Sequence, residues 1–298
     1  MVAAVLLSWA SWTFGAWSAE ARADTELKIG GSTIVLGAEP GGPLDPQVVD
    51  WVRRAASAVS AFYGHFPVER VRIQVARVPG RRVFGTTYGS HLIAMQLGEE
   101  ASPAQLEHDW TLTHEMFHLA FPDLDRSHLW MEEGMATYFE PIARARIDDL
   151  SPERVWSELF EGLPKGLPKD GDRGLDLTPT WGRIYWGGTL FWFLADLQIR
   201  ERTQNRHSAD DALRAILAAG GHGDVEWPIE RVLAVGDRGT GTTVLASLYK
   251  RMATHPYPVD VDALAGRLGV AASGGFDDKA PLAAVRRAVT SASENKRR

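Results

Sequence analysis

The chain has 298 residues, of which 45% are apolar, and its formal net charge is -6 at pH 7. It contains no cysteine, which excludes disulfides, thiolate metal ligands and a cysteine nucleophile, so any metal site must use His, Asp or Glu. The mild negative charge includes no long basic run, and we therefore expect no nucleic-acid partner.

The first 23 residues differ in composition from the rest of the chain. Residues 1–15 are mostly small and apolar, and Ala21-Arg22-Ala23 has the small-x-small form of a signal-peptidase site. We expect residues 1–23 to be an export signal, or alternatively an N-terminal membrane anchor, and the protein to be periplasmic or secreted. No other stretch is long and apolar enough to span a bilayer, so no membrane span is expected after removal of the signal.

Local patterns predict a mixed lobe of sheet and helix over residues 24–122. Asp45 is the predicted N-cap of its first helix, and Pro46 occupies the first turn of that helix. A helix followed by strands of one sheet indicates the α+β class. The predicted elements, in chain order, are a hairpin over 27–36 with its turn at Gly30-Gly31, a helix over 45–63, a strand over 71–78, a loop over 85–89 and a strand over 91–97.

A further helix is predicted to begin at Ser102 and to end before Pro122. Ser102 is its N-cap, and Gln105 stands at the capping-box position. We expect residues 24–290 to form a single domain, whose lobe over 123–290 is mostly helical, and 291–298 to be a disordered tail. The helices predicted in the second lobe cover 129–147, 186–202, 210–219, 241–253, 261–268 and 282–289.

The predicted helix that begins at Ser102 carries an H-E-x-x-H pentad, His114-Glu115-Met116-Phe117-His118. Two histidines four residues apart project from one face of a helix, where both can bind a zinc ion. Glu115 follows the first histidine and is placed to serve as the general base beside the open coordination position. The pentad therefore predicts a zinc site with His114 and His118 as ligands.

A catalytic zinc site needs a third protein ligand, and two histidines with one carboxylate form an established set. Glu133 lies 15 residues after His118 in a segment of helical character, and we take it as the third ligand. Gly134 beside it would let this helix approach the pentad helix closely. Glu132 is the nearest rival, but on a helix it points about 100° away from Glu133.

The sequence gives less support to other potential metal ligands and to groups that would orient the ligands. A metzincin needs Gly and His after the second histidine, where this chain has Phe121 and Leu124, so that class is excluded. The loop between His118 and Glu133 contains three further potential ligands, Asp123, Asp125 and His128. We interpret this loop as a surface turn and not as a source of metal ligands. The candidates for orienting the ligand imidazoles are Asp109, which we favour, His108 and Thr113.

These residues, together with the Trp-x-x-Glu-Gly-x-Ala-x-Tyr pattern of residues 130–138 and with Tyr185-Trp186-Gly187-Gly188 followed by residues 195–200, resemble the gluzincin metallopeptidases. Within them the glycyl aminopeptidase-like branch is the most similar. The resemblance implies an α+β, thermolysin-like zincin domain that binds one zinc ion and acts on peptides or proteins. It further implies that Glu133 is the third ligand and that Tyr185 stabilises the oxyanion, although Tyr185 could equally be a half-buried aromatic side chain at a helix start.

Two departures from the family pattern affect the prediction. Gly187 stands where relatives often have Lys. At the strand that holds the free amine of the substrate in aminopeptidases, we place Ala94-Met95-Gln96, and the neutral Gln96 cannot pair with an ammonium group. The sequence thus favours a zinc metallopeptidase that cleaves within chains. The alternatives are a catalytically silent zinc-binding protein and a zinc hydrolase of a non-peptide amide or ester.

Overall fold

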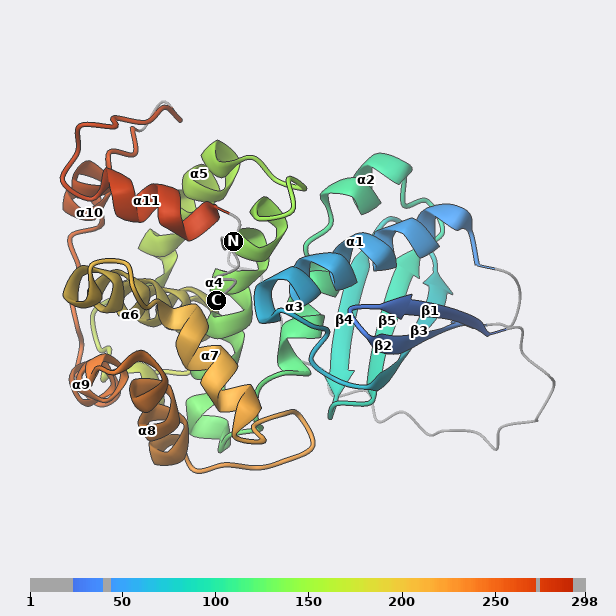
Figure 1. Ribbon diagram of the computed structural model, residues 1–298, viewed down its shortest axis with the longest axis horizontal. Coiled ribbons are helices and arrows are strands. Elements are labelled where there is room, and N and C mark those ends of the chain that lie inside the picture. Colours follow the sequence, from blue (N-terminus) through green and yellow to red (C-terminus); the bar gives the residue numbers. More distant parts are fainter. Residues whose placement is uncertain (1–23, 40–43, 272–273, 292–298) are drawn as a thin grey trace.

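The N-terminal lobe is built on a five-stranded mixed sheet (Figure 1). The computed structural model describes residues 24–39, 44–271 and 274–291, so the predicted signal or anchor over 1–23 and nearly all of the predicted tail lie outside the described residues. The sheet order is β1-β2-β3-β5-β4; β1 pairs antiparallel with β2, and β4 with β5, while the other two pairings are parallel. The strands are β1 Thr25–Ile29, β2 Ser32–Glu39, β3 Arg70–Val78, β4 Val83–Tyr88 and β5 Leu92–Gly98.

Helix α1, Pro46–Tyr63, lies across the sheet in Figure 1 and confirms the predicted helix. The Asp45 carboxylate accepts a hydrogen bond from the Gln47 backbone N–H at 2.9 Å, which caps the helix start as expected. The apolar stripe that predicted this helix is buried. The hairpin of β1 and β2, which turns at Gly30 and Gly31, is confirmed as well.

The predicted loop over residues 85–89 was wrong. These residues belong mostly to β4, which pairs antiparallel with β5 through Phe84 opposite Gln96 and Thr86 opposite Ala94. The segment does not alternate apolar and polar side chains, because β4 is an edge strand that has only one strand neighbour and that lines a cleft with part of its surface.

The predicted single helix from Ser102 is two helices, α2 Pro103–His108 and α3 Thr111–His118. The capping box of Ser102 is confirmed, since its hydroxyl accepts from the Gln105 N–H and the Gln105 amide oxygen accepts from the Ser102 N–H. The chain leaves the helical conformation at Asp109, whose carboxylate accepts from the Leu112 N–H at 3.3 Å. An aspartate bonded in this way favours a new helix start over continuation of the preceding helix.

The second half of the chain is helical, and the predicted α+β class with a helical C-terminal lobe is confirmed. Two of its helices, α5 and α8, were not predicted, although Ser151-Pro152 at the start of α5 repeats the cap signal of Ser102-Pro103. Within the described residues, no helix has both the length and the apolar character needed to cross a bilayer. The helices are α4 Leu129–Ala145, α5 Pro152–Gly162, α6 Gly188–Thr203, α7 Ala209–Ala218, α8 Ile229–Thr240, α9 Val244–Met252, α10 Val261–Leu268 and α11 Ala283–Thr290.

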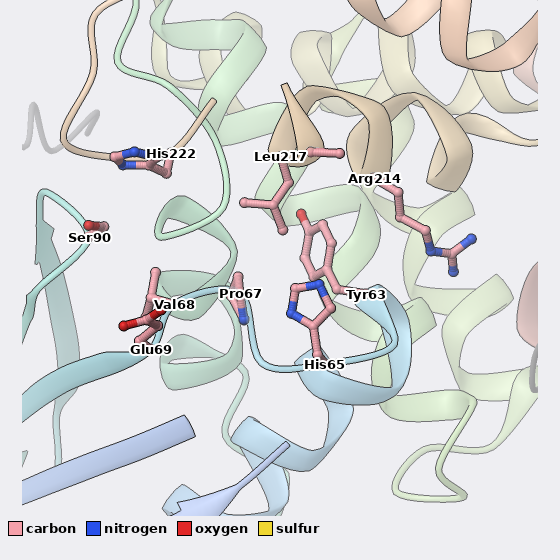
Figure 2. Close-up of a pocket in the computed structure, with 10 residues that line it drawn as sticks. Tyr63, His65, Pro67, Val68, Glu69, Ser90, Arg214, Leu217 and His222 are labelled. Atoms are coloured by element: carbon pink, nitrogen blue, oxygen red, sulfur yellow. The ribbon is translucent and has the colours of Figure 1, made fainter. Parts of the chain in front are cut away.

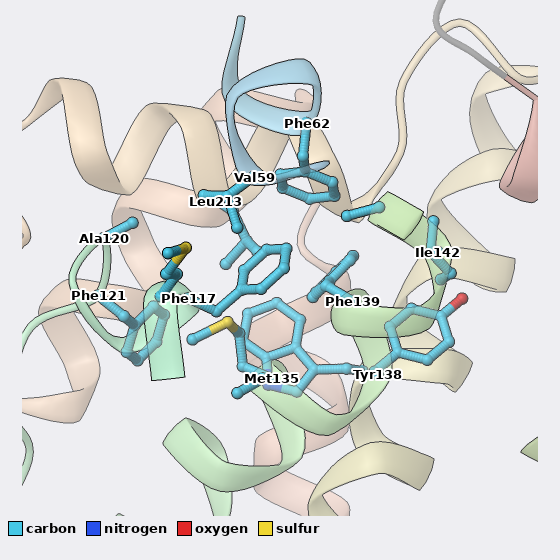
Figure 3. Close-up of a cluster of buried hydrophobic side chains, with 14 of the residues drawn as sticks. Val59, Phe62, Phe117, Ala120, Phe121, Met135, Tyr138, Phe139, Ile142 and Leu213 are labelled. Carbon is cyan, nitrogen blue, oxygen red and sulfur yellow. The ribbon is translucent and has the colours of Figure 1, made fainter. Parts of the chain in front are cut away.

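The two lobes share one hydrophobic core, part of which is drawn in Figure 3. Phe62 of α1, Phe117 of α3 and Phe139 of α4 meet there, with ring centroids 5.1 Å apart for Phe62 and Phe117 and 5.2 Å for Phe62 and Phe139. All three rings are fully buried. Aromatic packing of this kind fixes α3 against α4, so the other side chains of α3 are held in a defined position relative to α4.

Candidate metal centre

His114 and His118 lie one turn apart on α3. Their Nε2 atoms are 3.3 Å apart. His114 is buried at 3% exposure, and the side chain of His118 is 17% exposed. Because residues i and i+4 share a helix face, the helix itself brings the two imidazoles to one point.

Glu133 reaches the same point from α4. Its Oε2 lies 3.1 Å from Nε2 of His114 and 3.8 Å from Nε2 of His118. In a tetrahedral zinc site with bonds of about 2.0–2.2 Å, ligand atoms are roughly 3.3–3.6 Å apart. The separations of 3.1, 3.3 and 3.8 Å surround that range, so two nitrogen donors and one oxygen donor already stand at spacings that fit zinc.

Burial and the neighbouring charges shift the pKa values of all three side chains. Burial would lower the pKa of His114, but the hydrogen bond and charge of Glu133, with the charges of Glu115 and Glu140, raise it. Burial lowers the pKa of His118, so its ring is neutral at pH 7. Burial would raise the pKa of Glu133, but the two histidines outweigh it and lower this pKa. The charged carboxylate of Glu133 and the neutral ring of His118 are the forms that bind metal, whereas His114 with its raised pKa binds metal only after it loses its proton.

Glu132, the rival ligand, differs from Glu133 in its protonation state. Its Oε1 accepts a hydrogen bond from the Leu124 N–H at 3.1 Å. Burial, helped by the negative charges of Asp123 and Glu133, raises the pKa of Glu132 to about 8. Glu132 is therefore protonated at neutral pH, and a protonated carboxyl is a poor metal ligand. This difference favours Glu133.

Glu115 rests against the edge strand β4. The hydroxyl oxygen of Thr87 lies 2.7 Å from Oε2 of Glu115 and 2.8 Å from its backbone oxygen, within donor distance of both. Two residues earlier on the same strand face, Gly85 leaves room for the side chain, because a Cβ there would lie 2.5 Å from Cγ of Glu115. Sequence reasoning missed both residues, since it placed this segment in a loop.

Tyr185 lies in a π-helical turn, Arg183–Gly187, that leads into α6. Turns of this type are frequent at functional sites. The ring of Tyr185 stacks on that of His114, with centroids 6.4 Å apart, and its hydroxyl donates a hydrogen bond to Glu133. Burial, followed by the charges of Glu133 and Glu115, raises the pKa of Tyr185, so the hydroxyl keeps its proton.

These side chains line a cleft of about 360 Å³ between β4 and the helices α3 and α4. The strand that borders the cleft is β4, through residues 83–87. The prediction that Gln96 borders the substrate site was wrong, because Gln96 lies on β5, one strand further into the sheet, opposite Phe84. The error follows from the missed strand.

Gly134 permits a close approach, but the partner differs from the predicted one. A Cβ on Gly134 would collide with the backbone of Gly188 at the start of α6, and a Cβ on Gly188 would collide with the backbone of Trp130. The prediction that Gly134 lets α4 approach the pentad helix α3 was thus wrong, because the helix in close contact at Gly134 is α6. The contact between α4 and α6 holds Glu133 and the π-helical turn of Tyr185 in one unit.

The predicted supporting residues have other roles. Asp109 accepts hydrogen bonds from Thr111 Oγ1 and the Leu112 N–H, at 3.0 and 3.3 Å, instead of orienting an imidazole. Nδ1 of His108 lies 3.3 Å from Nη1 of Arg154, on the exposed side of α2. Thr113 is buried. Glu140, which the sequence did not single out, is a further carboxylate on α4 whose charge acts on His114, after those of Glu133 and Glu115.

The loop before α4 is a turn, as predicted. Asp125 accepts from the Ser127 N–H at 2.9 Å, and His128 pairs with Asp176 at 3.0 Å. Asp123 is exposed, as expected for a surface turn, and it also borders the cleft.

A second hollow, of about 410 Å³, lies at the end of α1, away from the metal centre (Figure 2). It is lined in part by His65, from the loop after α1, and by His222, from the loop after α7. Figure 2 shows these two rings well apart. In the part of the chain that the structure describes, one group of three side chains could hold a metal, namely His114, His118 and Glu133.

No protein-family model matches the sequence, and no curated protein matches it. Among solved structures, the chain is similar to an aminopeptidase N family protein from Idiomarina loihiensis, with a TM-score of 0.64 and 14% identity over 83% of this chain and 49% of that one. The chain has the fold of the M1 zinc metallopeptidases.

A second similar structure is a variant of an M1 zinc metallopeptidase from Deinococcus radiodurans, bound to a Tyr-Ser-Ala substrate. Its TM-score is 0.51, with 17% identity over 80% of this chain and 52% of that one. The chain therefore spans about half the length of the solved structures that it matches. The M1 fold supports the gluzincin prediction, while the glycyl aminopeptidase-like branch stays a prediction.

Proposed function

We propose that this protein is a zinc-dependent hydrolase of peptide bonds, with one ion held by His114, His118 and Glu133. The observation that carries the proposal is the convergence of two imidazole nitrogens and one carboxylate oxygen at 3.1 to 3.8 Å in an open cleft. Glu115 lines the same cleft but is not part of the converging set. A purely structural metal site needs no such carboxylate.

Each residue of the site has a separate task. A zinc ion bound there lowers the pKa of a water molecule to about 7 and polarises the substrate carbonyl. Glu115 accepts the proton as the water oxygen bonds to the carbonyl carbon, and then gives it to the amine nitrogen as the C–N bond breaks. Tyr185 keeps its proton and donates a hydrogen bond to the carbonyl oxygen as negative charge develops there.

We further propose that cleavage takes place within peptide chains. The segment of β4 that lines the cleft, residues 83–87, carries no charged side chain that could hold a free ammonium group. Of the remaining acids in the lining, Glu132 is protonated at neutral pH. A peptide with an acetylated N-terminus should be cleaved as fast as the free peptide. Cleavage confined to the free peptide would instead identify an aminopeptidase, with Asp123 as the first candidate for the amine site.

The proposal is tested by metal analysis and digestion of a broad peptide library, with the wild type and Glu115→Gln side by side. We expect one zinc per chain in both proteins and cleavage by the wild type alone. Zinc in both without cleavage of peptides would favour a silent zinc-binding protein. Turnover of esters or other amides without turnover of peptides would favour the non-peptide hydrolase.

Export remains part of the proposal, because it depends on residues 1–23. Expression of the full chain in a bacterial host, followed by mass spectrometry of the periplasmic fraction, tests it. A mature N-terminus at Asp24 is expected. Retention of residues 1–23 in the membrane fraction would support the anchor.

A further inference from the structure

Three of the exposed aromatic side chains of the described residues lie in or beside the cleft, whereas a fourth, Tyr88, is outside its lining. Phe84 is 43% exposed and Trp110 52% exposed, and both line the cleft. Trp181 is 61% exposed and packs on Tyr185, another lining residue. Single exposed apolar residues are ordinary, but a group of them beside a cavity indicates a binding surface.

Two of these side chains end a continuous row of rings. Trp110 meets His114 edge to face, with centroids 5.3 Å apart. The ring of His114 stacks on that of Tyr185 at 6.4 Å, and Tyr185 contacts Trp181 at 5.7 Å. The row therefore begins at an exposed indole, crosses the buried metal centre and ends at a second exposed indole.

The row has the length of a short peptide. Three steps of 5.3 to 6.4 Å span at most about five residues of an extended chain. Because the central rings belong to the metal centre, the two indoles lie beside positions that flank the bond to be cleaved. Phe84 adds a third ring from β4, and the guanidinium of Arg82 lies 4.8 Å from the centre of that ring.

The backbone around these rings is fixed. Trp110 immediately precedes α3, and the adjoining Asp109 is bonded to Thr111 and Leu112. Trp181 precedes the π-helical turn, which is tied down where the Thr189 hydroxyl donates to the Tyr185 carbonyl at 2.8 Å. Rings on such supports offer a preformed apolar surface with little entropy to lose on binding.

We propose that the cleft selects peptides that carry aromatic or large aliphatic side chains next to the scissile bond, and that Trp110 and Trp181, with Phe84, bind those side chains. This inference rests on the proposed peptidase function. The edges and faces of aromatic rings favour such partners, whereas a carboxylate would lose hydration against the electron-rich faces of the rings.

The test uses matched peptides that differ only in having Phe, Leu, Ser or Asp at the residues that flank the cleaved bond. The zinc-loaded wild type should prefer Phe and Leu over Ser and Asp by about tenfold or more in kcat/KM. Trp110→Ala and Trp181→Ala should each lose most of this preference, and Trp110→Phe should keep it. Leu177→Ala, which changes a 43% exposed residue outside the cleft lining, is the matched control.

A binding measurement separates recognition from turnover. Titration of zinc-loaded Glu115→Gln with the Phe and Ser peptides should show tighter binding of the Phe peptide, and the added change Trp110→Ala should abolish the difference. An active wild type with no side-chain preference would overturn this inference and leave the peptidase proposal standing. A wild type that binds zinc but cleaves no peptide would overturn both. If the tryptophan variants keep the side-chain preference of the wild type, and the wild type is a dimer while the variants are monomers, the rings belong to a self-association surface instead.

Discussion

Thr87 on the edge strand β4 places its hydroxyl oxygen 2.7 Å from Oε2 of Glu115 on α3. A hydrogen bond to a charged carboxylate contributes about 1.5–3 kcal/mol and fixes the side chain in one orientation. The sheet thus determines where the proposed general base points, while the helix determines where the metal ligands lie.

Thr87→Val keeps the shape of the side chain and removes the hydroxyl. We expect kcat to fall about tenfold or more, because Glu115 loses its fixed orientation. KM and zinc content should be nearly unchanged, since neither depends on this bond. Steady-state kinetics beside metal analysis check this. Thr87→Ser retains the hydroxyl and should keep most of the rate, and equal rates for the Val and Ser variants would show that the bond has no role in turnover.

The two adjacent glutamates of α4 should differ in their effect on metal binding. Glu133→Gln removes a charged carboxylate 3.1 Å from His114 and should weaken zinc binding by a factor of 100 or more, on the order expected for loss of one of three ligands. Glu132→Gln replaces a carboxyl whose pKa of about 8 leaves it uncharged at neutral pH, so zinc binding should be nearly unchanged. Competition with a chromogenic chelator measures both. The reverse order would make Glu132 the ligand.

Gly134→Ala should destabilise the protein, because the added methyl group meets the backbone of Gly188, which cannot move aside as a flexible side chain could. We expect a loss of about 2–3 kcal/mol in the free energy of unfolding. Gly266→Ala on α10 is the control, since a Cβ there meets nothing within 4 Å and alanine favours helix. Urea unfolding should show the control unchanged or slightly more stable. Equal stability of both variants would contradict the close packing of α4 and α6.

The ion pair between Arg146 and Asp210 should make stability depend on pH at the acidic end. The pair joins the C-cap residue of α4 to α7 at 2.7 Å, and both side chains are nearly fully buried. Burial alone would raise the pKa of Asp210, but Arg146 and Arg200 outweigh it and hold this pKa below its ordinary value. A carboxylate with a lowered pKa stabilises the fold above its unfolded pKa of about 4, and this contribution is lost as pH falls through the folded value.

Asp210→Asn should therefore cost about 3 kcal/mol at pH 7, because it leaves Arg146 buried without its partner. Its stability should also change less than that of the wild type between pH 4 and pH 2. Urea midpoints at these pH values check both points. Parallel pH profiles for the two proteins would mean that Asp210 does not contribute to the acid sensitivity.

The sequence was informative where local rules determine structure. The helical spacing of His114 and His118 is a property of any α-helix, and the caps at Asp45 and Ser102 are local hydrogen bonds. The sequence could not reveal the features of the site that depend on contacts between distant parts of the chain. Thr87 reaches Glu115 across 28 positions of the chain, and nothing near Val83–Tyr88 indicates that a helix will cover that strand.

The helix break at Asp109 and the π-helical turn at Tyr185 show a second limit. The helix break coincides with a single side-chain hydrogen bond of Asp109, and the π-helical turn lies in a glycine-rich segment whose composition does not indicate a helix of that type. The partner of Gly134 could not be chosen from sequence for the same reason. A glycine indicates that something comes close, but not which element does.

The most direct test of the account is the rate at which the zinc-loaded wild type and zinc-loaded Glu115→Gln cleave an internally quenched peptide with Phe beside the scissile bond. The account predicts equal zinc content, one ion per chain, with a fall in kcat of at least about 1,000-fold for the variant. Equal rates for the two proteins at equal zinc content would contradict it.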